Sequence, residues 1–135
     1  DVGSWEYIFK NKSEVIILAV GSMVKMAFDS IAELKKTINS EIDLVNCRFV
    51  KPLDIDTLQY ISKNYQFVIT IEEGSLIGGF GSMVNKFLSD YSTKVISMGI
   101  PDNYIEQGTR QELLDLAQLN TQGILNSINK IKNEK

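Results

Sequence analysis

The sequence predicts a three-layer α/β fold, with helices on both faces of a mostly parallel five-stranded sheet and one antiparallel strand at its edge. Residues 15–20 and 67–71 are short, continuously apolar runs, which are typical of strands covered on both faces. Such runs alternate with stretches whose apolar residues recur at helical spacing, and this alternation favours parallel strands joined by right-handed crossovers. The length of 135 residues suits a single domain that spans residues 1–135.

An edge strand and a long helix are expected in the first forty residues. Residues 5–10 alternate along the chain, with Trp5, Tyr7 and Phe9 on one face, which predicts a half-exposed edge strand. The apolar run at residues 15–20 then leads into a helix. The apolar stripe of that helix is formed by Val24, Ala27, Phe28, Ile31, Leu34 and Ile38.

The same alternation continues to the end of the chain. Residues 42–50 predict a strand, and Asp54 or Asp56 is expected to cap the next helix. Ser82 is expected to cap the helix that follows the strand at residues 67–71, and residues 94–100 predict the last strand. Thr109 and Glu112 fit a capping box, and Thr121 is expected to open the final helix. The apolar positions of these later helices are Leu58, Ile61, Tyr65, Val84, Phe87, Leu88, Tyr91, Leu113, Leu114, Leu116, Ala117, Ile124, Leu125, Ile128 and Ile131.

A turn rich in glycine joins the strand at residues 67–71 to its helix. A strand, a glycine turn and a helix N-terminus together suggest an anion site. The spacing from Gly74 to Gly79 is that of a P-loop, but Phe80 stands where the phosphate-binding Lys is required. Val84 likewise occupies the third small position of a dinucleotide motif.

Two carboxylates at the mouth of this turn, Glu72 and Glu73, would also repel a phosphate. We therefore interpret the glycines as residues that permit a tight turn and close packing. The turn is expected to be a contact surface.

Composition excludes several classes of function. The chain has no His, so it contains no Ser-His-Asp or Cys-His pair and no His metal ligand. Its one Cys, Cys47, lies in an apolar strand pattern and is expected to be a buried small hydrophobe. The net charge of −3 argues against nucleic-acid binding, and no run is apolar enough to span a membrane. Neither nucleic acid nor a membrane is an expected partner.

The polar segments that follow the expected parallel strands should meet at one edge of the sheet. They are residues 21–22, 48–54, 72–82 and 101–108. Ligands of open α/β sheets bind beyond the carboxyl ends of the strands. Whatever this domain contacts, we expect the contact to lie at this edge.

Three of these segments resemble the C-terminal third domain of the 1-deoxy-D-xylulose-5-phosphate synthases. They are Arg-Phe-Val-Lys-Pro-Leu-Asp at residues 48–54, the glycine turn at residues 72–82, and Ile-Pro-Asp-Asn-Tyr-Ile-Glu-Gln-Gly-Thr at residues 100–109. Their order and spacing match from about Glu14 to Ile128. The first two have looser counterparts in other transketolase-like enzymes, and the third points to the synthases. Several relatives have His where this chain has Met83.

The resemblance implies a homodimeric enzyme that condenses pyruvate with glyceraldehyde 3-phosphate on thiamine diphosphate and Mg²⁺, in isoprenoid synthesis. The cofactor motif, catalytic glutamate and histidines of that family belong to its first two domains. No catalytic, cofactor-binding or metal-binding residue is therefore expected in this chain, and its partners are expected to be the other domains of the same polypeptide. The abundance of Ile, Lys and Asn suggests a plastid, such as an apicoplast, or a bacterial cytoplasm.

The resemblance also implies that the carboxyl edge packs against a neighbouring domain and supports the dimer. The alternative is a partner-binding or regulatory module of another transketolase-like enzyme, such as a pyruvate dehydrogenase β subunit. We call the residues expected at this interface the contact rim. They are Arg48, Lys51, Asp54, Glu72, Glu73, Gly74, Gly78, Gly79, Gly81, Ser82, Asp102, Gln107 and Gly108.

Overall fold

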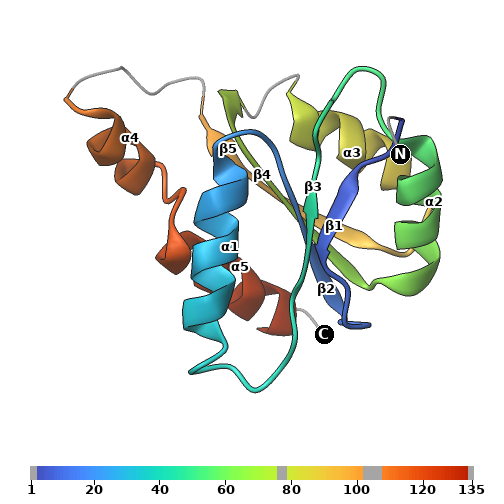
Figure 1. Ribbon diagram of the computed structural model, residues 1–135, viewed down its shortest axis with the longest axis horizontal. Helices are drawn as coiled ribbons and strands as arrows, with labels where there is room; N and C mark the ends of the chain where they lie inside the picture. The colour runs from blue at the N-terminus through green and yellow to red at the C-terminus, as the bar shows by residue number, and fades with distance from the viewer. Residues whose placement is uncertain (1–2, 76–78, 102–107, 134–135) are drawn as a thin grey trace.

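The computed structural model describes residues 3–75, 79–101 and 108–133 (Figure 1). Helices and strands alternate along most of this length. The strands are β1 (Glu6–Phe9), β2 (Val15–Ala19), β3 (Asp43–Asn46), β4 (Phe67–Ser75) and β5 (Lys94–Ile100). The helices are α1 (Met23–Leu34), α2 (Ile55–Asn64), α3 (Phe80–Leu88), α4 (Arg110–Leu116) and α5 (Thr121–Asn133).

The strands form one sheet in the order β1-β3-β2-β4-β5. Strand β1 pairs with β3 in the antiparallel direction, and the other three pairings are parallel. In the middle of the sheet, Ile17 of β2 lies opposite Leu44 of β3 and Ile69 of β4. The predicted mostly parallel sheet with an antiparallel edge strand is confirmed.

Each face of the sheet carries its own apolar core, because successive side chains of a strand point to opposite faces. Ile17 and Ala19 of β2 belong to a core with the buried side chains of α1 and α5. Ile16 and Leu18 belong to a second core with those of α2 and α3. Figure 1 shows α1 and α5 on one side of the sheet and α2 and α3 on the other. The three-layer prediction is therefore confirmed.

A buried carboxylate, Asp43, ties the start of β3 to its surroundings. It accepts hydrogen bonds from the Ser13 hydroxyl at 2.6 Å, the Asn11 backbone N–H at 2.8 Å and the Tyr65 hydroxyl at 2.5 Å. Burial, together with the hydrogen bond donated to Asp43, raises the pKa of the Tyr65 phenol, so it remains protonated and donates. This network closes the amino end of the sheet.

The edge strand differs from its predicted form. The register between β1 and β3 shifts between Tyr7 and Phe9. Tyr7 consequently packs against the core of α2 and α3, whereas Phe9 packs against that of α1 and α5. The prediction that Trp5, Tyr7 and Phe9 share one face is therefore wrong, because an irregularity in the pairing turns the strand.

Several element bounds also differ from the prediction. Helix α1 ends at Leu34, and Ile38 packs against the core from the following loop. Strand β3 covers only Asp43–Asn46 of the predicted residues 42–50. Leu116, predicted to be apolar and inward, is 69% exposed. Helical spacing overestimates burial where a helix lies at the margin of a core, as α4 does.

Gly81 marks the closest approach of α3 to the sheet. A Cβ atom at this position would lie 2.6 Å from Ser97 Oγ of β5 and 2.7 Å from Thr70 Oγ1 of β4. Only a glycine lets the helix lie this close to both strands without displacing them. The interpretation of this rim glycine as a residue of close packing is supported by that geometry.

We expect Gly81→Ala to lower the free energy of unfolding by about 1–3 kcal/mol, since an added methyl group must push α3 away from β4 and β5. Urea unfolding followed by circular dichroism measures this change. Gly3→Ala is the matched control, because nothing lies within 4 Å of a Cβ atom there. Equal stability of the two variants would contradict the assigned role of Gly81.

Candidate contact surface at the carboxyl edge of the sheet

A groove of about 410 Å³ lies at the carboxyl edge, where three of the four predicted segments meet. Val20 follows β2, Val50 and Lys51 follow β3, and Phe80 and Met83 belong to α3. Lys51 is exposed, and Met83 is half-buried. The groove therefore offers apolar side chains beside a solvated cation, a combination suited to contact with another protein surface.

Glu72 is buried and binds the N-terminus of α3. One carboxylate oxygen accepts a hydrogen bond from the Phe80 backbone N–H at 3.0 Å, and the other accepts one from the Gly81 N–H at 2.7 Å. The positive end of a helix is a favourable place for an anion, and here the chain supplies its own. This arrangement gives the physical reason why the turn does not suit a phosphate.

The predicted cap of α3 is wrong. Gly79 is the N-cap residue and has no side chain to cap the helix. Ser82 lies inside the helix, one residue beyond Gly81. Glu72 instead satisfies the first amides of the helix from the neighbouring strand. Sequence spacing cannot identify such a cap, because the carboxylate is eight residues from Phe80 along the chain.

Glu73, the second carboxylate of the turn, pairs with Arg110 at the start of α4. The Arg110 guanidinium also donates to the Ser22 hydroxyl before α1, at 3.2 Å. Arg110 thus joins two of the predicted segments, through Glu73 and Ser22, to the start of α4, which lies just beyond the fourth. It was absent from the predicted rim, because its only signal in the sequence was a place inside a capping box.

That capping box is present. The Thr109 hydroxyl accepts from the Glu112 N–H at 3.1 Å, and the Glu112 carboxylate accepts from the Thr109 N–H at 3.0 Å. Gly108 precedes it with a φ of +84°, in the region that favours glycine, and an added Cβ would lie 3.2 Å from the Glu112 carboxyl group. The rim glycine Gly108 therefore sets the entry into α4.

Asp54 and Arg48 hold the start of the chain against the carboxyl edge. Asp54 caps α2 by accepting from the Thr57 N–H at 3.1 Å, and it also accepts from the Trp5 N–H at 2.7 Å. Arg48 donates to the Ser4 carbonyl, and the Trp5 indole donates to the Phe49 carbonyl at 2.8 Å. Of the two predicted cap candidates, Asp54 is confirmed. Trp5, expected on a half-exposed strand, is buried by these contacts.

Two ionisable groups near these contacts have shifted pKa values. Burial raises the pKa of Asp54, but hydrogen bonds from the Trp5 N–H and from Thr57 outweigh it, so the net pKa lies below the ordinary value of 3.8. Burial, with the nearby Asp54 charge, raises the pKa of the Cys47 thiol well above its ordinary value. Cys47 is buried and protonated, as expected of a small core hydrophobe rather than a nucleophile.

Of the remaining rim residues, only Gly74 lies within the described part of the chain. Gly74 is exposed, and a Cβ atom there would lie 3.1 Å from a Glu72 carboxylate oxygen. Gly78, Asp102 and Gln107 lie outside the described residues. Within residues 3–75, 79–101 and 108–133, no group of three or more Asp, Glu or Cys side chains could hold a metal ion. In the same ranges, no helix is long and apolar enough to cross a membrane.

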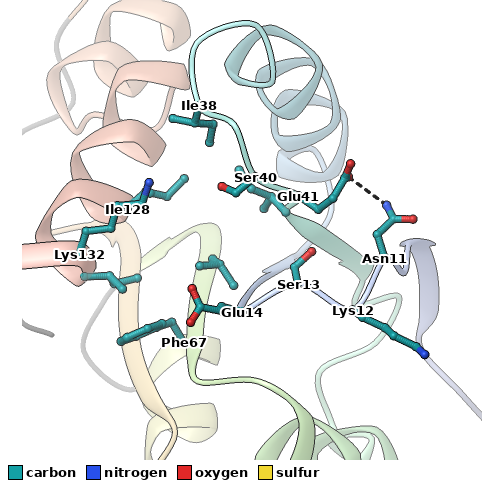
Figure 2. A pocket seen from close by; sticks show the side chains of 13 residues that line it. Asn11, Lys12, Ser13, Glu14, Ile38, Ser40, Glu41, Phe67, Ile128 and Lys132 are labelled. Atoms are coloured by element: carbon teal, nitrogen blue, oxygen red, sulfur yellow. Dashed lines mark hydrogen bonds between the residues drawn. The ribbon is translucent and has the colours of Figure 1, made fainter.

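A second cavity of about 260 Å³ lies at the opposite, amino edge of the sheet (Figure 2). Phe67, Ile128 and Ile38 contribute apolar side chains to it, and Glu14 and Lys132 are charged residues of its wall. At one side of it, Asn11 donates a hydrogen bond to Glu41 at 3.3 Å (Figure 2). None of the predicted rim residues lines this cavity.

Comparison with known proteins identifies the family to which this domain belongs. The model of the transketolase C-terminal domain family matches residues 3–124, so the chain belongs to that family. In solved structures, the chain superimposes on a split-gene transketolase in an inactive beta4 tetramer with a TM-score of 0.86 and 28% identity, covering 96% of this chain and 42% of that one. Transketolase from Campylobacter jejuni shares the fold, with a TM-score of 0.62 and 19% identity over 90% of this chain and 17% of that one.

The relatives found by sequence point to one kind of enzyme within the transketolase-like proteins. The 1-deoxy-D-xylulose-5-phosphate synthase of Lysinibacillus sphaericus is 41% identical over 117 residues, or 84% of this chain, and that of Clostridium tetani is 34% identical over 131 residues, or 96% of this chain. The chain spans only 18% and 21% of the length of these two relatives. The resemblance to the synthase family is thus confirmed, and the chain matches one part of these longer relatives.

We expect Glu72→Ala to lower the free energy of unfolding by about 2–4 kcal/mol, because the buried N–H groups of Phe80 and Gly81 lose their acceptor and a cavity replaces the carboxylate. Chemical denaturation measures the change. Glu73→Ala is the control, since its ion pair with Arg110 is exposed and should contribute less than about 1 kcal/mol. Equal losses in the two variants would show that Glu72 does not anchor α3.

The pKa of Asp54 predicts a dependence of stability on pH. Because its pKa is lower in the folded protein than in the unfolded chain, ionised Asp54 stabilises the fold at neutral pH, and this contribution disappears as the pH falls below about 4. We expect Asp54→Asn to be less stable at pH 7 and to lose less stability between pH 5 and pH 2 than the parent protein. Thermal unfolding across this range measures it, and identical slopes would contradict the assignment.

Proposed function

We propose that this chain is the C-terminal domain of a 1-deoxy-D-xylulose-5-phosphate synthase, a thiamine diphosphate-dependent transferase. The full enzyme would condense pyruvate with glyceraldehyde 3-phosphate and release carbon dioxide. Residues 1–135 would form one domain of a three-domain polypeptide, in a plastid or a bacterial cytoplasm. The identity to the synthases of Lysinibacillus sphaericus and Clostridium tetani supports this assignment.

We further propose that thiamine diphosphate and Mg²⁺ bind to other domains of the full enzyme. The described residues of the carboxyl edge do not fit the cofactor. A diphosphate needs cationic or N–H donors, but the N-terminus of α3 is taken by Glu72, and Glu73 stands beside it. The described residues also contain no cluster of carboxylates to hold Mg²⁺.

The role proposed for this domain is to pack its carboxyl edge against a neighbouring domain and so support the homodimer. The single observation that carries this proposal is the groove that joins Val20, Val50, Phe80 and Met83 to the exposed Lys51. Its lining includes these apolar residues, while the two carboxylates that also line it, Glu72 and Glu73, already have partners within the chain. Such a preorganised surface suits a contact better than chemistry.

The same groove suits a second candidate, a partner-binding or regulatory module of another transketolase-like enzyme, such as a pyruvate dehydrogenase β subunit. The specific observation in its favour is that Lys51 and Met83 remain accessible in this chain. Stoichiometric capture of a partner by this chain, with the other domains absent, would favour the docking module. Capture only by the remaining domains of the enzyme would favour the interdomain role.

In the full enzyme, we expect the double variant Lys51→Glu and Met83→Glu to lower turnover at least about tenfold and to weaken dimerisation, because it places two new charges in the contact. The same variant of the isolated chain should unfold within about 1 kcal/mol of the parent protein, since both side chains are accessible. Steady-state kinetics, sedimentation and thermal unfolding measure these effects.

Lys63→Glu is the control for this experiment, because Lys63 is an exposed cation at the opposite edge of the sheet. Normal turnover and an unchanged dimer in the double variant would refute the interdomain role. Micromolar binding of thiamine diphosphate by the isolated chain would refute the placement of the cofactor in other domains.

A further inference from the structure

The two edges of the sheet are built differently. Strand β1 has four residues, carries Glu6 and has an irregular register, all of which hinder pairing with another strand. Strand β5 has seven residues, and its register with β4 is regular from Lys94 to Met98. Among the described residues, β5 pairs only with β4. Its second edge is therefore the one suited to accept a further strand.

The direction of the backbone groups along β5 follows from one hydrogen bond. The Lys94 N–H donates to the Gln66 carbonyl at 2.9 Å, on the β4 side. In a parallel ladder, alternate residues direct both N–H and C=O to the same side, so Ile96 and Met98 also face β4. Val95 and Ser97 consequently direct their N–H and C=O groups away from the sheet.

These outward groups lie at an accessible surface. Val95, Ile96 and Ser97 are all half-buried, and a groove of about 280 Å³ runs beside Ile96 and Ser97. Gly99 has the same backbone orientation as Val95 and Ser97, but it is buried. The accessible part of the edge is therefore centred on Ile96.

We propose that a second copy of this chain pairs with this edge, β5 against β5 in the antiparallel direction, across a two-fold axis at Ile96. Val95 of each copy would then lie opposite the partner's Ser97. Each such pair exchanges two hydrogen bonds, giving about four in all, and satisfies every accessible outward group of the strand. The inference goes beyond the proposed function, because β5 contributes no residue to the contact rim.

Side chains favour the same register. The axis places Ile96 opposite the partner's Ile96, a β-branched apolar pair of the kind that stabilises antiparallel strands. Lys94 is the only charged residue of β5, and it would lie opposite the partner's Met98. The two lysines would be four strand positions apart, or roughly 13 Å, which is beyond the screening length of about 8 Å in physiological salt. Along β5 itself, a second copy thus brings no like charges together.

Amide hydrogen exchange of this 135-residue chain, combined with sedimentation, tests the proposal. We expect weak self-association, with a Kd between about 10 μM and 1 mM, since one strand pair forms a small interface. The N–H groups of Ile96 and Met98 should be protected at every concentration. Those of Val95 and Ser97 should become protected only as dimer forms.

Ser97→Pro gives the decisive variant, because it removes an outward N–H without removing a hydrogen bond to β4. It should raise the dimer Kd at least about tenfold, while Ser97→Ala, which keeps the N–H, should change it less than about threefold. Circular dichroism checks that both variants fold. If the proline variant does not fold, the hydrogen-exchange pattern of the parent chain still tests the proposal.

A chain that remains monomeric at 1 mM, or a dimer whose Val95 and Ser97 amides exchange as in the monomer, would overturn the proposal. The proposal would also be overturned if these two amides were protected in the full enzyme to the same extent in monomer and dimer. The edge would then pair with another segment of the same polypeptide. None of these outcomes depends on the contact rim. Failure of the proposed interdomain role would leave this test intact.

Discussion

The contact between Glu72 and the N-terminus of α3 is the interaction on which the carboxyl edge depends. It joins a strand in the middle of the sheet to the helix that covers one face, and it uses both oxygens of a buried carboxylate. Gly81 makes it possible, because α3 approaches β4 and β5 so closely that a side chain would collide with Thr70 and Ser97. The carboxylate and the glycine together determine where α3 begins and how near the sheet it lies.

This arrangement explains why a strand, a glycine turn and a helix form here without a phosphate site. The helix dipole is already neutralised from within the chain, so a phosphate would have to displace Glu72 and approach Glu73 as well. What remains is a groove lined by apolar side chains and one exposed lysine, together with polar groups that include Ser22. An edge whose carboxylates have partners within the chain and whose groove is lined by apolar side chains suits recognition of another surface, which accords with the role we propose for this domain.

Most of the fold could be predicted because it follows from local patterns. The apolar run of β2 and the apolar stripe of α5 each lie within a short stretch of sequence, so their burial could be predicted from the spacing of apolar residues. Capping by Asp54 and by Thr109 with Glu112 was predictable for the same reason, since the capping side chain and the N–H that it binds are three residues apart. The cap of α3 and the face of Phe9 were not predictable, because one depends on a strand carboxylate and the other on pairing between strands.

The sequence by itself determined the class of fold, the absence of histidine chemistry, and the edge at which polar segments gather, because these depend on composition and on periodicity along the chain. Tertiary structure alone decided how the charged residues of that edge are used. Arg48 and Asp54 hold the chain's own start, Glu72 anchors a helix, and Arg110 joins Glu73 to Ser22. These partners lie on different elements, from eight to 88 residues apart, and they meet only when the sheet and its helices assemble, so no local pattern specifies the contacts.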